Sequence, residues 1–329
     1  MSDPTLTDPA AFAHGLTGDD MVTPFEIKPL GARGRTVRLG ASITELLAQH
    51  DYPDAVAAVL AEAIALGALL GTTLKFDGRF ILQTQTDGAI DMMVVDFMTP
   101  GQIRAYARFD EDAVSAVSQG GPADASVYLG KGHLAMTVDQ GPDMERYQGI
   151  VALDGVSLSE AAHAYFAQSE QIPTSVRLAA GRVVTPGASG GTQWRAGGIL
   201  VQHLPSDGQS SPIELSAGDA PEGYEAKQLP EDDNWTRARV LMETTEDHEL
   251  IDPQLTTDRL LYRLYHEDGA TAYEPVPIIC KCHCSRERIS EVLNNFSAEE
   301  IADTVKDGQI TVNCEFCSRS YVFDPAEFS

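Results

Sequence analysis

The stretch IICKCHCSRER at residues 278–288, together with NCEFC at residues 313–317, contains all five cysteines of this chain. Cysteines that serve only as small core residues would be scattered, so this clustering indicates a shared ligand. A C-x-C pair on extended backbone, Cys282 and Cys284, directs both side chains to one face, and the C-x-x-C turn of Cys314 and Cys317 brings two more thiolates together. A tetrahedral zinc site needs four such soft ligands. We therefore predict that these four cysteines bind one Zn²⁺ per chain in the reduced state.

Two neighbouring residues leave the ligand set open at this point. Cys280 could replace Cys282 or Cys284, and His283 could be a fourth ligand. A histidine between two ligating cysteines would point off their face, which favours His283 outside the metal site. Cys280 follows the apolar run VPII, so we interpret it as a small buried residue. Four basic residues could offset the net charge of −2 that four thiolates leave on one Zn²⁺, or could be ordinary surface charges: Lys281, Arg286, Arg288 and Arg319.

The residues between the two cysteine pairs predict a fold that joins them. We expect a helix from about residue 286, then a second helix that begins at the capping box of Ser297 and Glu300 and ends near residue 307. The run QITVNC should return as a strand, and a last strand should follow the second cysteine pair. The expected inward-facing residues are Ile289, Val292, Leu293, Tyr321 and Phe323. About fifty residues hold such a fold poorly, so bound metal should carry much of its stability.

The chain has 329 residues, more than one hydrophobic core usually organises, so we expect two or more units. Its 49 acidic and 23 basic residues give a net charge of −26, which repels phosphate backbones and anionic membranes. We therefore expect no nucleic-acid partner and no membrane partner. The start lacks a signal-peptide pattern, and the apolar stretch at 55–71, interrupted by Glu62, is short for a membrane span. We interpret it as a buried core helix and the protein as cytoplasmic.

Residues 1–205 predict an α+β domain built around a mainly antiparallel sheet. Ser42 with Glu45, and Ser157 with Glu160, have the spacing of capping boxes, which predicts helices to about residues 50 and 171. Pro53 fits the first turn of the long apolar helix. Strand-like runs bounded by turn signals occupy 79–86, 90–98, 102–109, 133–138, 147–153, 174–185 and 193–203.

Residues 206–271 predict an acidic, partly helical linker. Between 206 and 270 there are 16 acidic and 5 basic residues, and the entry is rich in Gly, Pro and Ser. Helical patterns follow at about 233–245 and 255–267, the second with an apolar stripe of Leu260, Leu261, Leu264 and Tyr265. The linker is either a connector whose two helices dock on a neighbour or a marginally stable segment that melts and exposes this stripe. The zinc-binding domain then occupies 272–329.

Several motifs resemble one family in the same order along the chain. CHCSRER at 282–288 followed by CEFC at 314–317 resembles the zinc module of the thirty-three-kilodalton chaperonins, the redox-regulated heat-shock holdases of bacteria. Other segments similar to that family are HDYP at 50–53, LKFDG at 74–78, ERYQGIV at 145–151, YFAQSEQIPT at 165–174 and LYRLYHE at 261–267. Cys280 departs from the pattern, so the resemblance assigns it no role.

The resemblance implies a stress-response chaperone that needs no ATP and is inactive when reduced and zinc-bound. Oxidation in that family joins neighbouring cysteines, here Cys282 with Cys284 and Cys314 with Cys317, expels zinc and unfolds the zinc domain. The linker is then destabilised, and the protein binds unfolding client proteins, commonly as a homodimer. Zinc-held thiolates are the oxidisable form of cysteine, which agrees with this implied behaviour.

Two other functions compete with this one. A zinc-ribbon nucleic-acid protein would need a basic surface, yet residues 280–329 hold 5 basic and 9 acidic residues. A thiol-disulfide oxidoreductase would use Cys314 and Cys317 at the start of a helix, whereas this C-x-x-C is expected between strands. The sequence contains no P-loop, GxSxG or HExxH motif, so we expect no enzyme and no ATP-driven chaperone.

Overall fold

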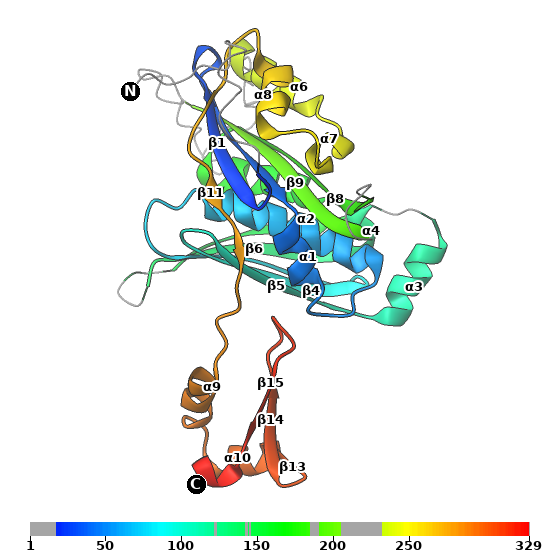
Figure 1. The fold of residues 1–329 in the computed structure, drawn as a ribbon, viewed down its shortest axis with the longest axis vertical. Helices are drawn as coiled ribbons and strands as arrows, with labels where there is room; N and C mark the ends of the chain where they lie inside the picture. The colour runs from blue at the N-terminus through cyan, green and yellow to red at the C-terminus, as the bar shows by residue number, and fades with distance from the viewer. Residues whose placement is uncertain are drawn as a thin grey trace, which may run out of the picture.

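Two mainly antiparallel sheets enclose one long helix in the computed structural model, which describes residues 18–121, 124–141, 144, 146–184, 191–204 and 232–328 (Figure 1). The first sheet has the order β10 (Thr271–Ala272), β1 (Met21–Ile27), β2 (Ala32–Leu39), β9 (Thr192–His203), β8 (Thr174–Val184), with β11 (Val276–Pro277) also paired to β1. The second has the order β12 (Ile279–Cys280), β5 (Gln102–Phe109), β4 (Ile90–Met98), β3 (Arg79–Thr86), β6 (Lys131–Asp139), β7 (Tyr147–Asp154). The predicted α+β class and its mainly antiparallel pairing are confirmed.

The enclosed helix is α2 (Asp54–Gly71), which confirms the predicted core helix at 55–71. Its glycines let it lie close to the second sheet: a Cβ at Gly67 would be 2.6 Å from Val95, and one at Gly71 would be 2.3 Å from Phe97. In the described part of the chain it is the one helix long and apolar enough to cross a membrane. Since 78% of the apolar window is buried inside the protein, α2 has the burial of a core helix.

The strands predicted between residues 79 and 203 are confirmed, with ends within two residues of the expected ones. Strands β1 and β2 carried no prediction. Thr23, Thr36 and Arg38 are polar residues at buried positions of these strands. They interrupt the alternation of apolar and polar residues by which a strand is predicted. The short helices α3 (Glu111–Gln119) and α4 (Ala125–Leu129) were likewise not predicted.

One of the predicted capping boxes is wrong. Helix α1 (Ala41–Leu47) begins after Gly40 without a side-chain cap, and Ser42 is buried. The carboxylate of Asp20, distant in sequence, takes the capping role by accepting hydrogen bonds from the backbone N–H of Gly40 (2.9 Å) and of Ser42 (3.1 Å) and from the Ser42 hydroxyl. The capping box of Ser157 and Glu160 is confirmed at the start of α5 (Leu158–Tyr165), which continues as a π-helical turn over Phe166–Glu170. Pro53 lies one residue earlier than expected, as the N-cap of α2.

Three helices after residue 232 cover the outer face of the first sheet: α6 (Asp233–Glu243), α7 (Asp247–Ile251) and α8 (Thr257–Tyr265) (Figure 1). The predicted stripe of α8 is confirmed, because Leu260, Leu261, Leu264 and Tyr265 are all buried there with Trp235 of α6. They pack on apolar sheet residues such as Phe25 and Ile199. Helix α7 was not predicted, and the entry to the predicted linker at 206–231 lies outside the described residues.

Buried arginines of the first sheet bind the end of helix α7. Arg195 of β9 donates from Nε to the carbonyl of Ile251 at 2.7 Å, and Arg38 of β2 donates from Nη2 to the carbonyl of Asp252 at 2.7 Å. Arg195 also pairs with both carboxylate oxygens of Asp19. These two carbonyls lie at the C-terminal end of a helix, where cations are stabilising.

The C-terminal module has the two predicted helices and two predicted strands in order: α9 (Arg286–Leu293), α10 (Ala298–Thr304), β14 (Gln309–Asn313) and β15 (Ser320–Phe323). The short strand β13 (Val305–Lys306) was not predicted and takes the place of the last turn expected for the second helix. The capping box of Ser297 and Glu300 is confirmed. Its buried core is small, consisting of Leu293, Ile301, Ile310 and Phe323. The inward position predicted for Val292 is wrong, since 56% of it is exposed: the face of α9 that meets this small core is too narrow to include it.

Candidate metal centre

Four cysteine sulfurs meet where the C-terminal module approaches the second sheet. Cys282 and Cys284 lie on the extended segment after β12, and Cys314 and Cys317 lie in the turn between β14 and β15. All four Sγ atoms are within 4.8 Å of one another. The Sγ atoms of Cys282 and Cys314 are 3.6 Å apart, and those of Cys284 and Cys317 are 3.4 Å apart. Four sulfurs around one zinc ion would be about 3.8 Å apart for Zn–S bonds of about 2.3 Å, so the arrangement fits a tetrahedral metal site.

Local backbone contacts shape both halves of the cluster. Ser285, the residue after Cys284, is the N-cap of α9. Its hydroxyl accepts from the N–H of Arg288 at 3.3 Å, and the helix begins at the next residue. In the second half, the N–H of Ser318 donates to the carbonyl of Cys314 at 2.8 Å, and Ser318 has a left-handed φ of 54° that closes the turn. Tyr321 of β15 donates its hydroxyl to Cys284 Sγ at 3.2 Å. The sequence predicted Tyr321 only as core material.

The thiols differ in acidity. Burial, the largest influence, raises the pKa of Cys282, but hydrogen bonds from the backbone and thiol of Cys284 and from neighbouring thiols outweigh it and lower the value to about 7. Burial first, then the hydrogen bond with Cys284, raises the pKa of Cys317. Cys282 therefore ionises more readily than Cys317 before any metal binds, and thiolate is the form that binds metals and reacts with oxidants.

Cys280 and His283 lie outside this group of four sulfurs. The Cys280 thiol packs against the main core and accepts from Gln49 Nε2 at 3.4 Å. Burial and the nearby carboxylate of Glu45 raise its pKa to about 11, which keeps it protonated at neutral pH. His283 uses its backbone carbonyl to accept from Arg288 Nη1 at 2.8 Å.

The positive charge near the sulfurs comes partly from a residue that the sequence did not predict. Arg104 of β5 directs Nη1 toward Cys282 Sγ at 3.9 Å. Of the four basic residues expected nearby, Arg319 interacts electrostatically with the thiols. Its hydrogen bond with Tyr321 is the largest cause that raises its pKa, and the charges of Cys284 and Cys317 add to this effect. Arg286 instead pairs with Glu327 at 3.1 Å and covers the ring of Phe323. Arg104 could not be found from sequence because 178 residues separate it from Cys282.

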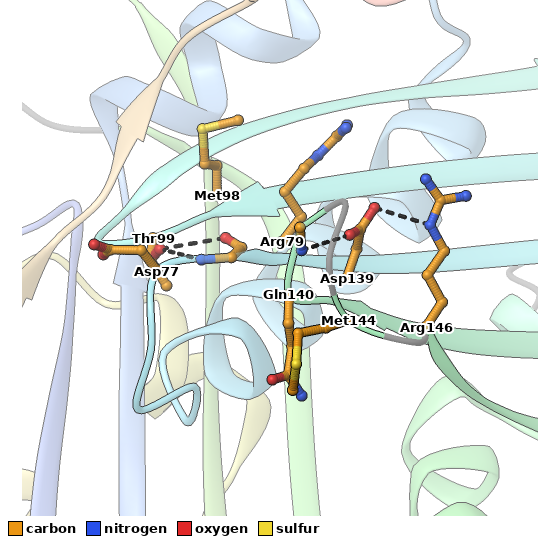
Figure 2. Close-up of a pocket in the computed structure, with 10 residues that line it drawn as sticks. Asp77, Arg79, Met98, Thr99, Asp139, Gln140, Met144 and Arg146 are labelled. Carbon is orange, nitrogen blue, oxygen red and sulfur yellow. Dashed lines mark hydrogen bonds and ion pairs between the residues drawn. The ribbon is translucent and has the colours of Figure 1, made fainter.

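Apart from the sulfur cluster, the structure has a hollow of about 570 Å³ beside β3, β4 and the loop after β6 (Figure 2). Most of its polar groups form ion pairs or hydrogen bonds within the protein. Arg146 pairs with Asp139 at 3.0 Å, and Arg79 pairs with Asp96. The Thr99 hydroxyl and the backbone of Gly78 bond to each other. This hollow holds no cluster of thiols or imidazoles, so the sulfur cluster is the stronger candidate site.

Taken together, the fold and the site define a protein in which a four-thiol metal module is joined to an α+β core. Comparison with known proteins agrees: the family model described as Hsp33 protein matches residues 20–324. The chain is 48% identical over 309 residues to a 33 kDa chaperonin of Caulobacter vibrioides, covering 93% of this chain and 95% of that one. It is 35% identical over 315 residues to a 33 kDa chaperonin of Pseudomonas aeruginosa, covering 95% and 94%.

The chain therefore belongs to the Hsp33 family, a family of chaperones, as its motifs predicted. A crystal structure of a 33 kDa chaperonin from Thermotoga maritima has the same fold, with a TM-score of 0.71 at 21% identity over 94% of this chain and 96% of that one. The relatives of this chain are named as chaperonins and not as enzymes.

Proposed function

We propose that this chain is a redox-regulated holdase chaperone that is silent when reduced and zinc-bound and becomes active when its thiols are oxidised. The observation that carries this proposal is the cluster of four sulfurs in a module that buries only four apolar residues of its own. A core of that size supplies little stability, so a metal that crosslinks the two cysteine segments is what would hold the module folded.

Cys282, Cys284, Cys314 and Cys317 would hold one Zn²⁺, since four thiolates at these distances suit it. When bound, zinc supplies a crosslink between the segments and keeps all four sulfurs deprotonated. In each pair one thiolate attacks peroxide, the O–O bond breaks, and a sulfenic acid and hydroxide form. The second thiolate attacks that sulfur, an S–S bond forms and a second hydroxide leaves, so each peroxide takes two electrons from two thiolates.

The pairing we propose is Cys282 with Cys284 and Cys314 with Cys317, as the family resemblance implies. Two close sulfur contacts join the segments instead, at 3.6 Å from Cys282 to Cys314 and at 3.4 Å from Cys284 to Cys317. A tetrahedral site brings every pair of sulfurs close, so these distances do not select a pairing. Once a disulfide forms, neither of its sulfurs is a thiolate that can bind the metal, and the metal-dependent module then unfolds.

The linker would respond next. Helices α6 to α8 lie on the first sheet, and strands β10 to β12 connect them to the cysteine segment. Unfolding of the module removes the anchor at one end, and the short helices have little stability when undocked. The stripe of Leu260, Leu261, Leu264 and Tyr265 then becomes available to unfolding client proteins. Val240 of α6 is already 48% exposed in the docked state, so undocking would add little of it to this surface.

The remaining parts of the proposal follow from this scheme. The units are a core at 1–205, a metastable linker at 206–271 and a zinc-binding redox switch at 272–329, working without ATP in the cytoplasm. Strands β11 and β12 of the last unit pair with the core sheets, which ties the switch closely to the core. The oxidised form would act as a homodimer, and the charge of −26 would help to keep the opened chain in solution.

The test is to measure zinc content and suppression of client aggregation, with and without peroxide under mild heat. We expect one zinc per reduced chain, and chaperone activity only after peroxide has released it. Reduced protein that protects clients as well as oxidised protein would contradict the proposal. A thiol-disulfide oxidoreductase would instead turn over a dithiol substrate, but here the C-x-x-C turn lies between strands and not at a helix start.

A further inference from the structure

The turn at 314–318, which carries the second cysteine pair, is docked on the outer face of the second sheet. The helix α2 covers the other face of that sheet, and the C-terminal module approaches from the uncovered side (Figure 1). Two residues, Glu315 and Phe316, lie between the cysteines of this turn. Phe316 is half-buried and contacts the second sheet. Its ring packs edge-on against Tyr106 of β5, with ring centres 5.0 Å apart.

Arg104, two residues before Tyr106 on the same face of β5, holds this turn from two directions. Its guanidinium carbon lies 4.0 Å from the centre of the Phe316 ring, a cation–π contact. Its Nη1 points to Cys282 Sγ at 3.9 Å. The same guanidinium therefore touches both cysteine segments, one through an aromatic ring and one through a sulfur atom.

The guanidinium itself is fixed by a buried acid. Asp96 of β4 is 3% exposed and accepts from Arg104 Nε at 2.7 Å and Nη2 at 2.6 Å. Arg79 of β3 donates to both oxygens of the same carboxylate and shares Oδ2 with Arg104. Because Asp96 keeps one arginine when the other is removed, the loss of Arg104 leaves no buried charge unpaired.

Three further hydrogen bonds hold the cysteine segments at this place. The N–H of Lys281 donates to the carbonyl of Ile103 at 3.0 Å, which ends the β12–β5 pairing immediately before Cys282. His50, after α1, bonds the Phe316 carbonyl at 3.3 Å and the Ser318 hydroxyl at 3.0 Å. The turn is thus bound by two separate core elements.

We propose that Arg104 is a positioning residue for the cysteine site: it docks the 314–318 turn on the second sheet. The oxidation state of the thiols then decides whether this turn stays docked. The inference rests on the proposed zinc–thiol switch. In the reduced, metal-bound state the site carries a net charge of −2 beside the guanidinium. Two disulfides are neutral, so oxidation removes the charge that faces Arg104 and leaves the ring contacts of Phe316 and the hydrogen bonds of His50 to hold the turn.

The test uses the reduced, zinc-loaded full chain and measures the rate of zinc release by peroxide together with amide exchange in β5 and the 314–318 turn. Arg104→Gln and Phe316→Ala should each speed zinc release by about three- to tenfold, the range expected for one cation–π contact with a partly buried partner. Both should also raise amide exchange in the turn. The double variant should speed release by less than the product of the two single effects, because the two changes share the cation–π contact and each removes one further contact of its own.

Two variants separate positioning from a general loss of stability. Arg79→Gln removes the other arginine on Asp96, and Arg108→Gln removes an exposed residue of β5 that pairs with Asp91. Both should release zinc at the wild-type rate, and Arg104→Lys, which keeps charge but not the planar fork, should lie between wild type and Arg104→Gln. Equal acceleration by Arg79→Gln would overturn the inference, as would wild-type release and exchange in both Arg104→Gln and Phe316→Ala. Failure of wild type to bind zinc or release it with peroxide would refute the proposed function instead.

Discussion

A charge placed in the apolar stripe of α8 should activate the chaperone without any oxidant. Leu264 is 3% exposed and packs in the cluster that joins α8 to the first sheet. Leu264→Asp loses about 2–3 kcal/mol of apolar burial and puts a carboxylate into a cluster of buried apolar side chains. A total of about 3 kcal/mol or more shifts the docking equilibrium of the helix by a factor of about 100 or more. The helix should undock in preference to burying the charge.

The assay follows amide exchange of α8 and aggregation suppression in reduced, zinc-bound protein. Tyr262→Asp is the matched control, since it makes the same change of charge in the same helix at a position that is 41% exposed. We expect Leu264→Asp to lose protection in α8 and to protect clients, while the control stays protected and silent. An α8 that exchanges freely in a protein that stays silent would refute the idea that linker docking restrains activity. An α8 that stays protected would refute the energetic estimate.

Three other perturbations test the site and the fold. Single changes of Cys282, Cys284, Cys314 or Cys317 to Ser should sharply lower zinc affinity, measured by competition with a chelator, whereas Cys280→Ser should not, because its thiol lies outside the cluster. Ser297→Ala should cost about 1 kcal/mol of helix stability and speed zinc release by oxidant, and unchanged kinetics would show that this helix start is not limiting. Burial, with Asp124 and Asp247 nearby, raises the pKa of Glu62 to about 7, so the folded state binds more protons than the unfolded one and stability should fall as pH rises from about 4.5 to 7. Glu62→Gln should flatten that fall by up to about 3 kcal/mol in denaturant titrations, and an unchanged pH profile would count against the raised pKa.

The parts predicted correctly are those whose signals are local. Strands with regular alternation, capping boxes such as Ser297 with Glu300, and cysteine pairs at close spacing all carry their evidence within a few residues. The stripe of α8 belongs to the same class, because helical periodicity fixes which residues share a face. The four sulfurs also came together as expected, since the 29 residues between the pairs form a compact unit that returns the chain to its start.

The parts that were missed depend on contacts distant in sequence. Ser42 has the spacing of a cap, but Asp20 occupies the helix start, and no local pattern reveals that competition. Strands β1 and β2 have polar residues at buried positions because the linker helices cover that face. Arg104 looks like an ordinary charge on a strand until the cysteine segment is brought beside it. Such positions are determined by tertiary packing, which local sequence patterns do not encode.

The covered face of the first sheet bears on the release of the linker that we propose. Phe25, Leu261 and Tyr265 give this interface an apolar centre that favours docking. Around that centre, several buried side-chain atoms have no protein hydrogen-bond partner: Thr23 Oγ1, Thr36 Oγ1, Arg38 Nη1, Thr245 Oγ1, Thr257 Oγ1 and Asp258 Oδ1. Each such atom costs about 1–3 kcal/mol when it is removed from water without a partner, and burial raises the pKa of Asp258 accordingly. These costs offset part of the apolar gain, so docking is weaker than the apolar area alone would give, and loss of the anchor at residues 271–280 should weaken it further.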